Sequence, residues 1–380
     1  MAEIELIQVP LDDRRLVDRF IRVQWWVHRE HEPNDYWVPP LLMDRRDYLN
    51  ESKNPFFEHA TCAFWIARDQ GRDVGRIAAV HDVDWEKHHG DKVGYFGMFD
   101  AANDPQVAEA LIGAARSWLQ ERGLSQMIGP MDLSTNYMAG LLIEGFDSPP
   151  GMQMPYNPAY YEQLIEGCGL SKVKDLWQWY LSTDTPIPDK VSRVADKIRK
   201  RSRITVRPMD LGRWDQEVGR VIEIYNDAWD QNWGFVPVGE REFRHIAADL
   251  KMVLRPELAL MAEVDGEPVA FSIAVMNINP LLKKLDGKLF PFGLLRLLWD
   301  LKVRPKVRDC RLIVLGIKSG FRRRGIDSIL FVDTHRAVSE LGWDGGELGW
   351  TLEDNDMVNR AIESMQGEKI KNYRVYGVDL

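Results

Sequence analysis

The segment Leu312-Ile-Val-Leu-Gly-Ile-Lys-Ser-Gly-Phe-Arg-Arg-Arg-Gly-Ile-Asp-Ser-Ile-Leu330 decides the expected fold of this chain. Its apolar first part predicts a strand that ends at Ile317, and an amphipathic helix is expected from about Ile326 to Leu341. A basic turn that contains glycine joins the two. The unpaired amides and the dipole at a helix N-terminus favour negative charge. The segment therefore predicts an anion-binding site.

Three consecutive arginines in the turn indicate which anion would bind. Arg322, Arg323 and Arg324 add positive charge and forked donors that suit phosphate. The turn lacks the Gly-Lys-Ser/Thr ending of a Walker A loop, and it has no Gly-x-Gly-x-x-Gly pattern. The expected ligand is one that carries a phosphate or pyrophosphate group.

Composition narrows the class of protein. A chain of 380 residues with 45% hydrophobic residues predicts two domains. The formal net charge of −9 argues against general nucleic-acid binding. Three distant cysteines without a Cys-x-x-Cys pattern suit neither a disulfide framework nor a metal site. Without a signal-peptide pattern or an apolar run of about 20 residues, a cytoplasmic protein with no membrane span is expected.

The order of the predicted elements indicates an internal duplication. Each half reads β-α-β-β-β-α-β-α-β, with hairpin turns at Asp69–Asp73 and Asp265–Pro268. This order predicts an α/β fold of two domains, each with a mixed, mostly antiparallel sheet flanked by helices. We expect an N-terminal domain over residues 1–183, a basic linker helix over residues 184–202 and a C-terminal domain over residues 203–380.

The element order and the Arg322-x-x-Gly325 turn resemble the GNAT superfamily of acyl-CoA-dependent N-acyltransferases, and the layout resembles a bacterial group of two-domain GNAT-like proteins. The resemblance implies that the turn binds the pyrophosphate of acetyl-CoA or another acyl-CoA, the acyl donor. Asp327 stands where the family pattern has Gly or Ala, and its carboxylate would repel pyrophosphate unless it points away. The corresponding junction of the first half, Phe96–Pro105, lacks the pattern. Only the C-terminal domain is therefore expected to bind the donor.

The resemblance also implies how the site would work. In this superfamily an amine attacks the thioester carbonyl directly, and a backbone amide polarises that carbonyl. By position, the amides of Leu315–Ile317 are the candidates for this role, and the backbone of Gly320–Gly325 would hold the pyrophosphate. The candidate cofactor-binding residues are Leu315, Ile317, Gly320, Arg322, Arg323, Arg324, Gly325 and Ile326.

Proton transfer needs ionisable side chains near these positions. Glu347 is an acid within an otherwise apolar predicted strand, and we take it as the candidate catalytic base. Glu353 and Asp354 are alternatives, although a surface charge and a helix cap explain them more simply.

The acid for the leaving thiolate is harder to assign. The superfamily often places a tyrosine in the helix that follows, where this chain has Ser364 and Met365. Tyr373 is therefore the candidate acid, with Tyr376 as an alternative, and cross-strand packing explains both tyrosines equally well.

Two segments are candidates for contacting the acceptor. The insertion Asn279–Arg308 is apolar with basic flanks. We expect a lid or packing element there, and an acceptor channel, a dimer contact and membrane-surface attachment are the alternatives. The long loop Asp132–Tyr161 is the other candidate surface. A small-molecule or peptide amine is the expected partner, with a homodimer as an option.

Together these features predict a transferase, an acyl-CoA-dependent N-acyltransferase such as an N-acetyltransferase, whose acceptor amine the sequence does not identify. The competing interpretation is a noncatalytic acyl-CoA-binding or scaffold protein. In that case Asp327 and the missing tyrosine mark lost chemistry, and fold-level analogy does not choose between the two.

Overall fold

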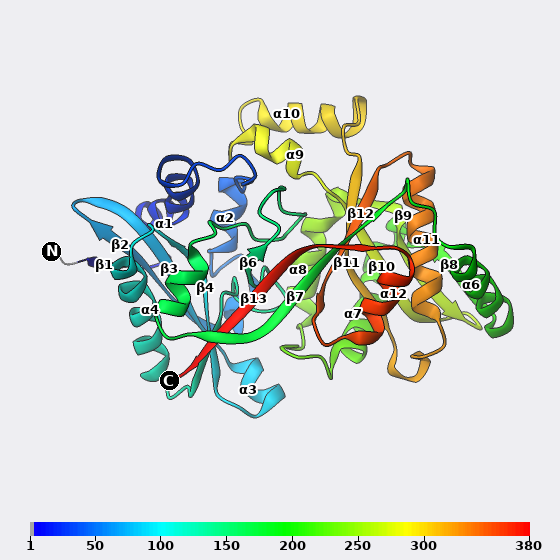
Figure 1. Ribbon diagram of the computed structural model, residues 1–380, viewed down its shortest axis with the longest axis horizontal. Coiled ribbons are helices and arrows are strands. Elements are labelled where there is room, and N and C mark those ends of the chain that lie inside the picture. The colour runs from blue at the N-terminus through cyan, green and yellow to red at the C-terminus, as the bar shows by residue number, and fades with distance from the viewer. Residues whose placement is uncertain (1–3) are drawn as a thin grey trace. The chain divides into compact units, whose positions relative to one another are not determined.

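The structure, a computed structural model, describes residues 4–380 (Figure 1). Residues 1–3, which begin the stretch without a signal-peptide pattern, lie outside the described residues. The elements of the first half are β1 (Glu5–Gln8), α1 (Arg14–Trp26), α2 (Leu42–Tyr48), β2 (Ala60–Asp69), β3 (Arg72–Asp82), α3 (Val83–His89), β4 (Val93–Ala101), α4 (Pro105–Gln120), β5 (Gln126–Gly129), β6 (Leu141–Glu144), α5 (Tyr161–Gly167) and β7 (Ser171–Ser182).

The second half follows a similar order, with α6 before its first strand, a longer helical insertion between β10 and β11, and no counterpart of β6. Its elements are α6 (Asp189–Ser202), β8 (Ile204–Pro208), α7 (Trp214–Trp229), α8 (Glu240–Leu250), β9 (Leu254–Val264), β10 (Glu267–Met276), α9 (Asn279–Leu282), α10 (Gly293–Leu298), β11 (Asp309–Ile317), α11 (Ile326–Glu340), β12 (Gly345–Leu352), α12 (Asp356–Ser364) and β13 (Glu368–Asp379). The expected α/β class with mixed, mostly antiparallel sheets flanked by helices is confirmed.

Two compact units divide the chain. The first unit comprises Met1–Leu176, Asn279–Leu297 and Asn372–Leu380, and the second comprises Trp177–Ile278 and Leu298–Lys371. Strands β7 and β13 therefore each contribute residues to both units.

The first unit is built on strands in the order β1-β2-β3-β4-β5-β13. Neighbouring strands are antiparallel, except that β4 and β5 run parallel. Helix α4 begins as the sequence predicts, because the Asp104 side chain caps it and Pro105 occupies its first turn. Its apolar stripe, which includes Val107, Leu111 and Ala115, packs into the core of this unit.

The second unit contains strands in the order β7-β12-β11-β10-β9-β8, with β11 and β12 parallel. Ala195 of α6 joins α11 in the apolar core on one face of the sheet. On β10, the Ser272 hydroxyl lies 3.3 Å from Thr334 Oγ1 of α11. The adjacent Phe271 points to the other face, where its ring centroid is 6.4 Å from that of Trp229 in α7. Helices α11 and α7 thus cover opposite faces.

The helix that the sequence analysis treats as a linker is α6. Its Arg199 Nη2 donates to both carboxylate oxygens of Asp333 in α11, at 2.6 and 2.7 Å. This charge-assisted contact and the buried Ala195 make α6 a packed part of the second unit.

Two local expectations differ from the structure. Helix α12 begins at Asp356, and the side chain that caps it is Asn355, which accepts from the N–H of Val358, rather than Asp354. The long first-half loop contains a strand, β6, whose Leu142 pairs with Tyr373 of β13. A four-residue strand inside a loop rich in Gly and Pro leaves little periodicity to detect.

Candidate functional site

Strands β11 and β12 pair over only part of their length. The parallel register joins Asp309–Leu312 to Gly345–Leu348. On the edge that faces β10, Ile313 of β11 is an extra residue, and a bulge of this kind bends its strand. Beyond this point β11 continues to Ile317 and β12 to Leu352 outside the shared register. The two strands therefore open at the bulge.

The open edge of β11 presents backbone amides. The N–H of Lys318 donates to the carbonyl of Val269 at 2.9 Å, so Lys318 faces the strand β10. Residues of an antiparallel strand direct their N–H and C=O groups alternately to the two sides. Gly316 therefore also faces β10, whereas Leu315 and Ile317 direct their amides toward the edge that β12 has left. These are the two predicted carbonyl-polarising positions.

The turn after β11 is fastened to the end of α7. The Ser319 hydroxyl donates to Asp227 Oδ1 at 3.0 Å, and the Ser319 N–H donates to the same carboxylate. Arg322 Nη2 donates to the carbonyl of Ala228 at 2.6 Å. The side chain of Arg322 thus holds the turn in place, a structural role that the sequence motif does not reveal.

The other two arginines of the turn are held differently. Arg324 Nη2 donates to the carbonyl of Gly320 at 3.0 Å, and its guanidinium lies 4.6 Å from the centre of the Phe321 ring. Arg323 is exposed, and no ion pair joins it to another described residue. Its positive charge is therefore available to an anion from solvent.

Helix α11 begins without a side-chain cap. Its N-cap residue is Gly325, which has a φ of +76° and makes no side-chain cap hydrogen bond. Only glycine adopts this conformation at little cost. The first-turn amides, beginning with Ile326, remain without intrahelical partners. Asp327 lies half-buried in the same turn. The predicted turn thus does place a helix N-terminus beside three arginines.

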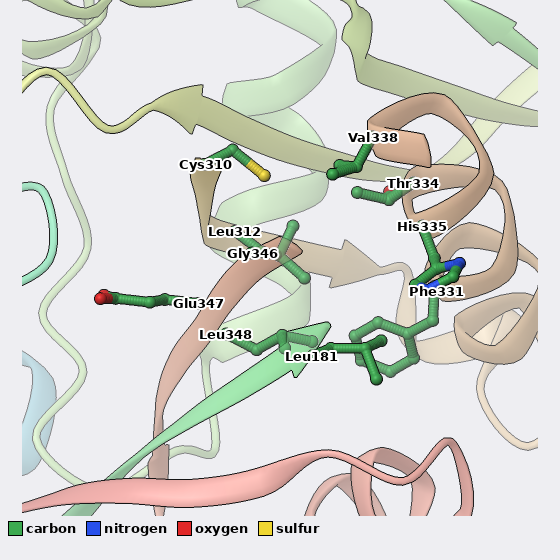
Figure 2. A pocket seen from close by; sticks show the side chains of 10 residues that line it. All are labelled: Leu181, Cys310, Leu312, Phe331, Thr334, His335, Val338, Gly346, Glu347 and Leu348. Carbon is green, nitrogen blue, oxygen red and sulfur yellow. The ribbon is translucent and has the colours of Figure 1, made fainter. Parts of the chain in front are cut away.

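An apolar pocket lies on the α11 side of the paired part of the strands (Figure 2). Gly346 leaves room there, since a Cβ atom would stand 2.9 Å from the Cys310 sulfur. Burial raises the pKa of the Cys310 thiol, so this cysteine is an apolar lining group at neutral pH. The lining residues are Leu181, Cys310, Leu312, Phe331, Thr334, His335, Val338, Gly346, Glu347 and Leu348.

Glu347 lies in β12 just before its pairing with β11 ends. Its carboxylate points away from the other side chains of the pocket (Figure 2). Gln178 Nε2 of β7 donates to Glu347 Oε2. Burial raises the pKa of Glu347 to about 7, although the positive charges of Arg311 and Lys371 act in the opposite direction. A carboxylate with this pKa exchanges protons near neutrality, which is the property a general base needs.

Arg311 is a feature of the site that the sequence analysis missed. It pairs with Glu347 across the parallel register, and its Nε and Nη2 donate to the carbonyl of Gly349 at 3.1 and 2.8 Å. It therefore holds the backbone of β12 at the residue where the shared register has just ended. The signal was available, because Arg311 and Glu347 are both charged residues within apolar strands.

Both tyrosines that the sequence offers as the acid belong to the first unit. Tyr373 is fully buried and belongs to the first unit, whereas Glu347 belongs to the second. Tyr376, also in the first unit, donates to Glu162 Oε1 at 3.0 Å, and burial together with this acid raises its pKa. At the end of α12 the Ser364 hydroxyl donates to the carbonyl of Ala361, and Met365, which follows the helix, is buried.

The corresponding junction of the first unit is filled by the chain itself. The parallel register of β4 and β5 ends at Tyr95 and Ile128, and the next residues return to β4. The N–H of Met131 donates to the carbonyl of Phe96 at 2.8 Å, and Asp132 accepts from the N–H of Met98. At the following helix, α4, a side-chain cap closes the N-terminus.

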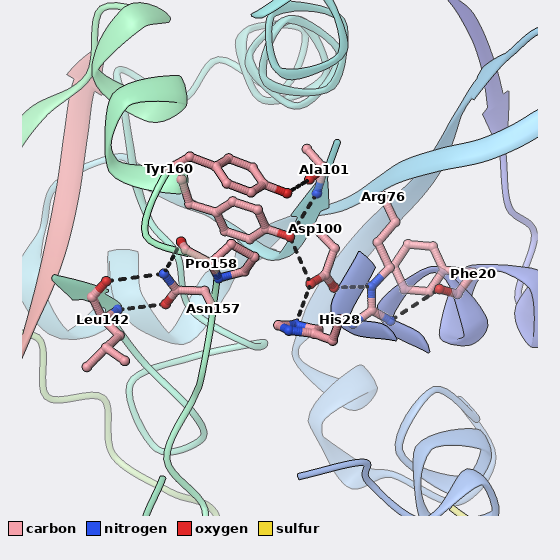
Figure 3. Close-up of polar contacts among 10 residues, drawn as sticks. Phe20, His28, Arg76, Asp100, Ala101, Leu142, Asn157, Pro158 and Tyr160 are labelled. Atoms are coloured by element: carbon pink, nitrogen blue, oxygen red, sulfur yellow. Dashed lines mark hydrogen bonds and ion pairs between the residues drawn. The ribbon is translucent and has the colours of Figure 1, made fainter. Parts of the chain in front are cut away.

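A buried ion pair lies at the end of β4 (Figure 3). Arg76 Nε donates to Asp100 Oδ2 at 2.7 Å, and His28 Nε2 is 3.7 Å from the other carboxylate oxygen. Burial alone would raise the pKa of Asp100, but Arg76 and His28 lower it below the usual value. Tyr161 also contacts this carboxylate, at 3.3 Å. Asp100 is therefore a fixed negative charge with a structural role.

One group of potential metal ligands occurs among the described residues, although the sequence predicted none. Nitrogen and oxygen atoms of His59, Asp82 and Asp84 lie within 4.8 Å of one another. Asp82 caps α3 by accepting from the N–H of Asp84, and His59 Nδ1 is 2.9 Å from the same Asp82 oxygen. Helix capping and a His–Asp contact account for these distances.

Comparisons with known proteins agree with this fold. A tandem GNAT protein from the clavulanic acid biosynthesis pathway superposes with a TM-score of 0.56 and 12% identity, covering 99% of this chain and 98% of that one. A GCN5-related N-acetyltransferase from Sphaerobacter thermophilus gives 0.51 and 13%, covering 98% and 95%. No family model matches the sequence. The chain therefore has a tandem GNAT-like fold.

Two proteins with similar sequences show the family to which the chain belongs. Protein YghO of Escherichia coli is 38% identical over 350 residues, which cover 91% of this chain and 88% of the relative. Bacterial ceramide synthase of Caulobacter vibrioides is 36% identical over 380 residues, covering 98% and 97%. The chain belongs to the family of these two proteins.

Proposed function

We propose that the protein transfers a fatty acyl group from acyl-CoA to the amine of a long-chain amino alcohol, forming an amide and free CoA. The observation that carries this proposal is the open edge of β11 followed by an uncapped helix N-terminus. The relative named bacterial ceramide synthase suggests the acceptor, because a ceramide is the amide of a fatty acid with a long-chain amino alcohol.

The donor would lie along the open edge of β11. The amides of Leu315 and Ile317 would hydrogen-bond the donor and polarise the thioester carbonyl. The backbone of Gly320–Gly325, the N–H of Ile326 and the exposed side chain of Arg323 would hold the pyrophosphate, and the nearby charges of Arg322 and Arg324 would favour its binding. Asp327 must point away from that group, since two like charges would otherwise face each other.

The chemistry requires one proton to leave the amine and one to reach the sulfur. The amine nitrogen attacks the thioester carbon, the carbon–sulfur bond breaks, and a carbon–nitrogen bond replaces it. Glu347 would accept the amine proton, since its raised pKa permits both protonation states near neutrality. The released thiolate would take its proton from solvent water, because Tyr373, the acid expected from the sequence, is fully buried in the first unit. The apolar pocket lined by Leu312 and Leu348 would receive the first carbons of the acyl chain.

Binding of the donor tests the site. In calorimetric titrations, acyl-CoA should bind and Arg323→Ala should weaken that binding about tenfold, because a charge-assisted contact is lost. Arg323 makes no ion pair with another described residue, so the free variant should keep its melting temperature. Arg72→Ala, an exposed arginine of the first unit, is the matched control and should change nothing.

Product formation tests the reaction. Release of CoA thiol should require a long-chain amino alcohol and should be faster with a fatty acyl-CoA than with acetyl-CoA. Donor binding without thiol release from any amine would favour the noncatalytic acyl-CoA-binding interpretation. Absence of binding by every CoA thioester would remove the proposed site altogether.

A further inference from the structure

The insertion between β10 and β11 is an ordered segment with an anchored inner side. Leu281, Leu285 and Leu297 are buried. Asn279 Nδ2 donates to the carbonyls at positions 150 and 151, at 2.8 and 2.9 Å. Asp286 Oδ1 accepts from the indole N–H of a first-unit tryptophan at 2.9 Å. The segment is thus held in a defined conformation.

The outer side of the same segment is apolar. A helix on the surface of a globular protein usually buries its apolar side chains and exposes charged ones. Here α10 and the helical turn that continues it, Trp299–Val303, expose large apolar groups. Among the described residues, six of the thirteen exposed large hydrophobic side chains fall within this segment, with exposures from 38% to 75%. They are Phe290, Phe292, Leu295, Leu298, Trp299 and Val303.

Positive charge surrounds these apolar groups. Between Lys283 and Arg308 the sequence has eight Lys and Arg residues against two Asp, a formal charge of +6 in a chain of −9. Both acids are already engaged. Asp286 also forms an ion pair with an arginine at 2.9 Å, and Asp300 is buried against Lys306 at 2.6 Å. Arg308 is paired with Asp344 outside the segment at 2.6 Å, and the remaining exposed charge of the segment is positive.

We propose that Lys283–Arg308 binds the surface of a lipid bilayer that contains anionic lipid. Exposed aromatic and leucine side chains would enter the headgroup region, and the lysines and arginines would contact lipid phosphates. No helix among residues 4–380 is long and apolar enough to cross a bilayer, so the contact is with the surface.

Charge selects a bilayer over a second copy of this chain. A symmetric dimer through this segment would place its +6 against an identical +6. Like charges that face each other across a contact oppose association. A bilayer with anionic lipid instead offers phosphates to the cations and an apolar interior to the exposed hydrophobic side chains. This proposal goes beyond acyl transfer, and its test needs neither acyl-CoA nor an acceptor.

Vesicle binding of the full chain tests the proposal. The protein should float with vesicles of phosphatidylcholine mixed with phosphatidylglycerol, and salt should release it. Phe292→Ser combined with Trp299→Ser should lower the bound-to-free ratio about tenfold or more, because two apolar anchors are lost. Met252→Ser combined with Met357→Ser is the matched control, since these side chains are 72% and 56% exposed against 75% and 56%.

Three results would overturn the proposal. They are equal binding to pure phosphatidylcholine, an equal loss in the control double variant, and no vesicle binding by the native chain. Light scattering completes the test: a concentration-dependent dimer that the Phe292/Trp299 variant abolishes, without vesicle binding, would assign the segment to a second copy. Equal melting temperatures of both double variants would show that the folds are intact.

Discussion

The two strand–turn–helix junctions, β4 to α4 and β11 to α11, share a design and differ in what fills them. Each has a bulged strand whose parallel register with the next strand stops after three or four pairs. In the first unit, Met131 and Asp132 return to β4 and Asp104 caps α4. In the second, Leu315 and Ile317 face an open edge and α11 has no side-chain cap. The same scaffold is thus closed in one unit and open in the other.

Buried carboxylates show the same contrast. Asp100 is 2.7 Å from the Arg76 guanidinium, and despite its burial its pKa is lowered. Glu347 is also buried, but the cations around it offset burial only in part, and its pKa is raised to about 7. One carboxylate is a fixed charge within the fold, and the other is able to exchange a proton. The difference supports the second unit as the proposed site of acyl transfer.

The largest expected effect comes from removing the proton acceptor. Glu347→Gln, at the proposed proton acceptor, should lower kcat about 10²- to 10⁴-fold, which is the usual contribution of a general base. The amide keeps the size of the side chain, so acyl-CoA affinity should stay unchanged in the calorimetric titration. Steady-state thiol release measures kcat. A variant that keeps a third or more of the native rate would show that Glu347 is not the base.

The pH dependence of the rate should follow the ionisation of Glu347. The carboxylate form accepts the amine proton, so kcat should rise about tenfold per pH unit below pH 7 and level off above it. In Glu347→Gln this rise of kcat with pH below pH 7 should disappear. The raised pKa also means that the fold favours the protonated acid, so its contribution to stability is lost as pH rises through about 7. If kcat of the variant still rises with pH below pH 7, the ionisation that controls the rate belongs to another group.

Local patterns in the sequence predicted the elements that carry the candidate site. The strand, the basic turn and the helix of the second junction were predicted because each has its own signal in apolar periodicity, glycine and charge. Glu347 was selected because an acid is unusual in an apolar strand. Its partner Arg311 has the same signal, and the pairing itself depends on a parallel register between strands about 35 residues apart in sequence.

Long-range pairing accounts for what could not be predicted. The extra residue Ile313 is defined only by its position opposite β10. The hydrogen bond from Met131 to Phe96 of β4 also joins segments that are distant in the sequence. The same holds for Asn372–Leu380, which join the first unit although they lie at the end of the chain. Tyr373 was selected from sequence order, and the structure places it in the first unit. Contacts of this kind leave no periodic signal in a single sequence.

The smallest expected effect tests the closed junction. Asp104 Oδ1 accepts from the N–H of Gln106 at 2.9 Å and caps α4. Asp104→Ala should lower the free energy of unfolding by about 1 kcal/mol, and Asp104→Gly by only a few tenths of that, since glycine tolerates the cap position. Denaturant titration measures both. Acyl-CoA affinity should stay unchanged in each variant, because the proposed donor site is at the other junction. A loss of donor affinity in Asp104→Ala would instead place the donor at α4 and reverse the comparison between the two units.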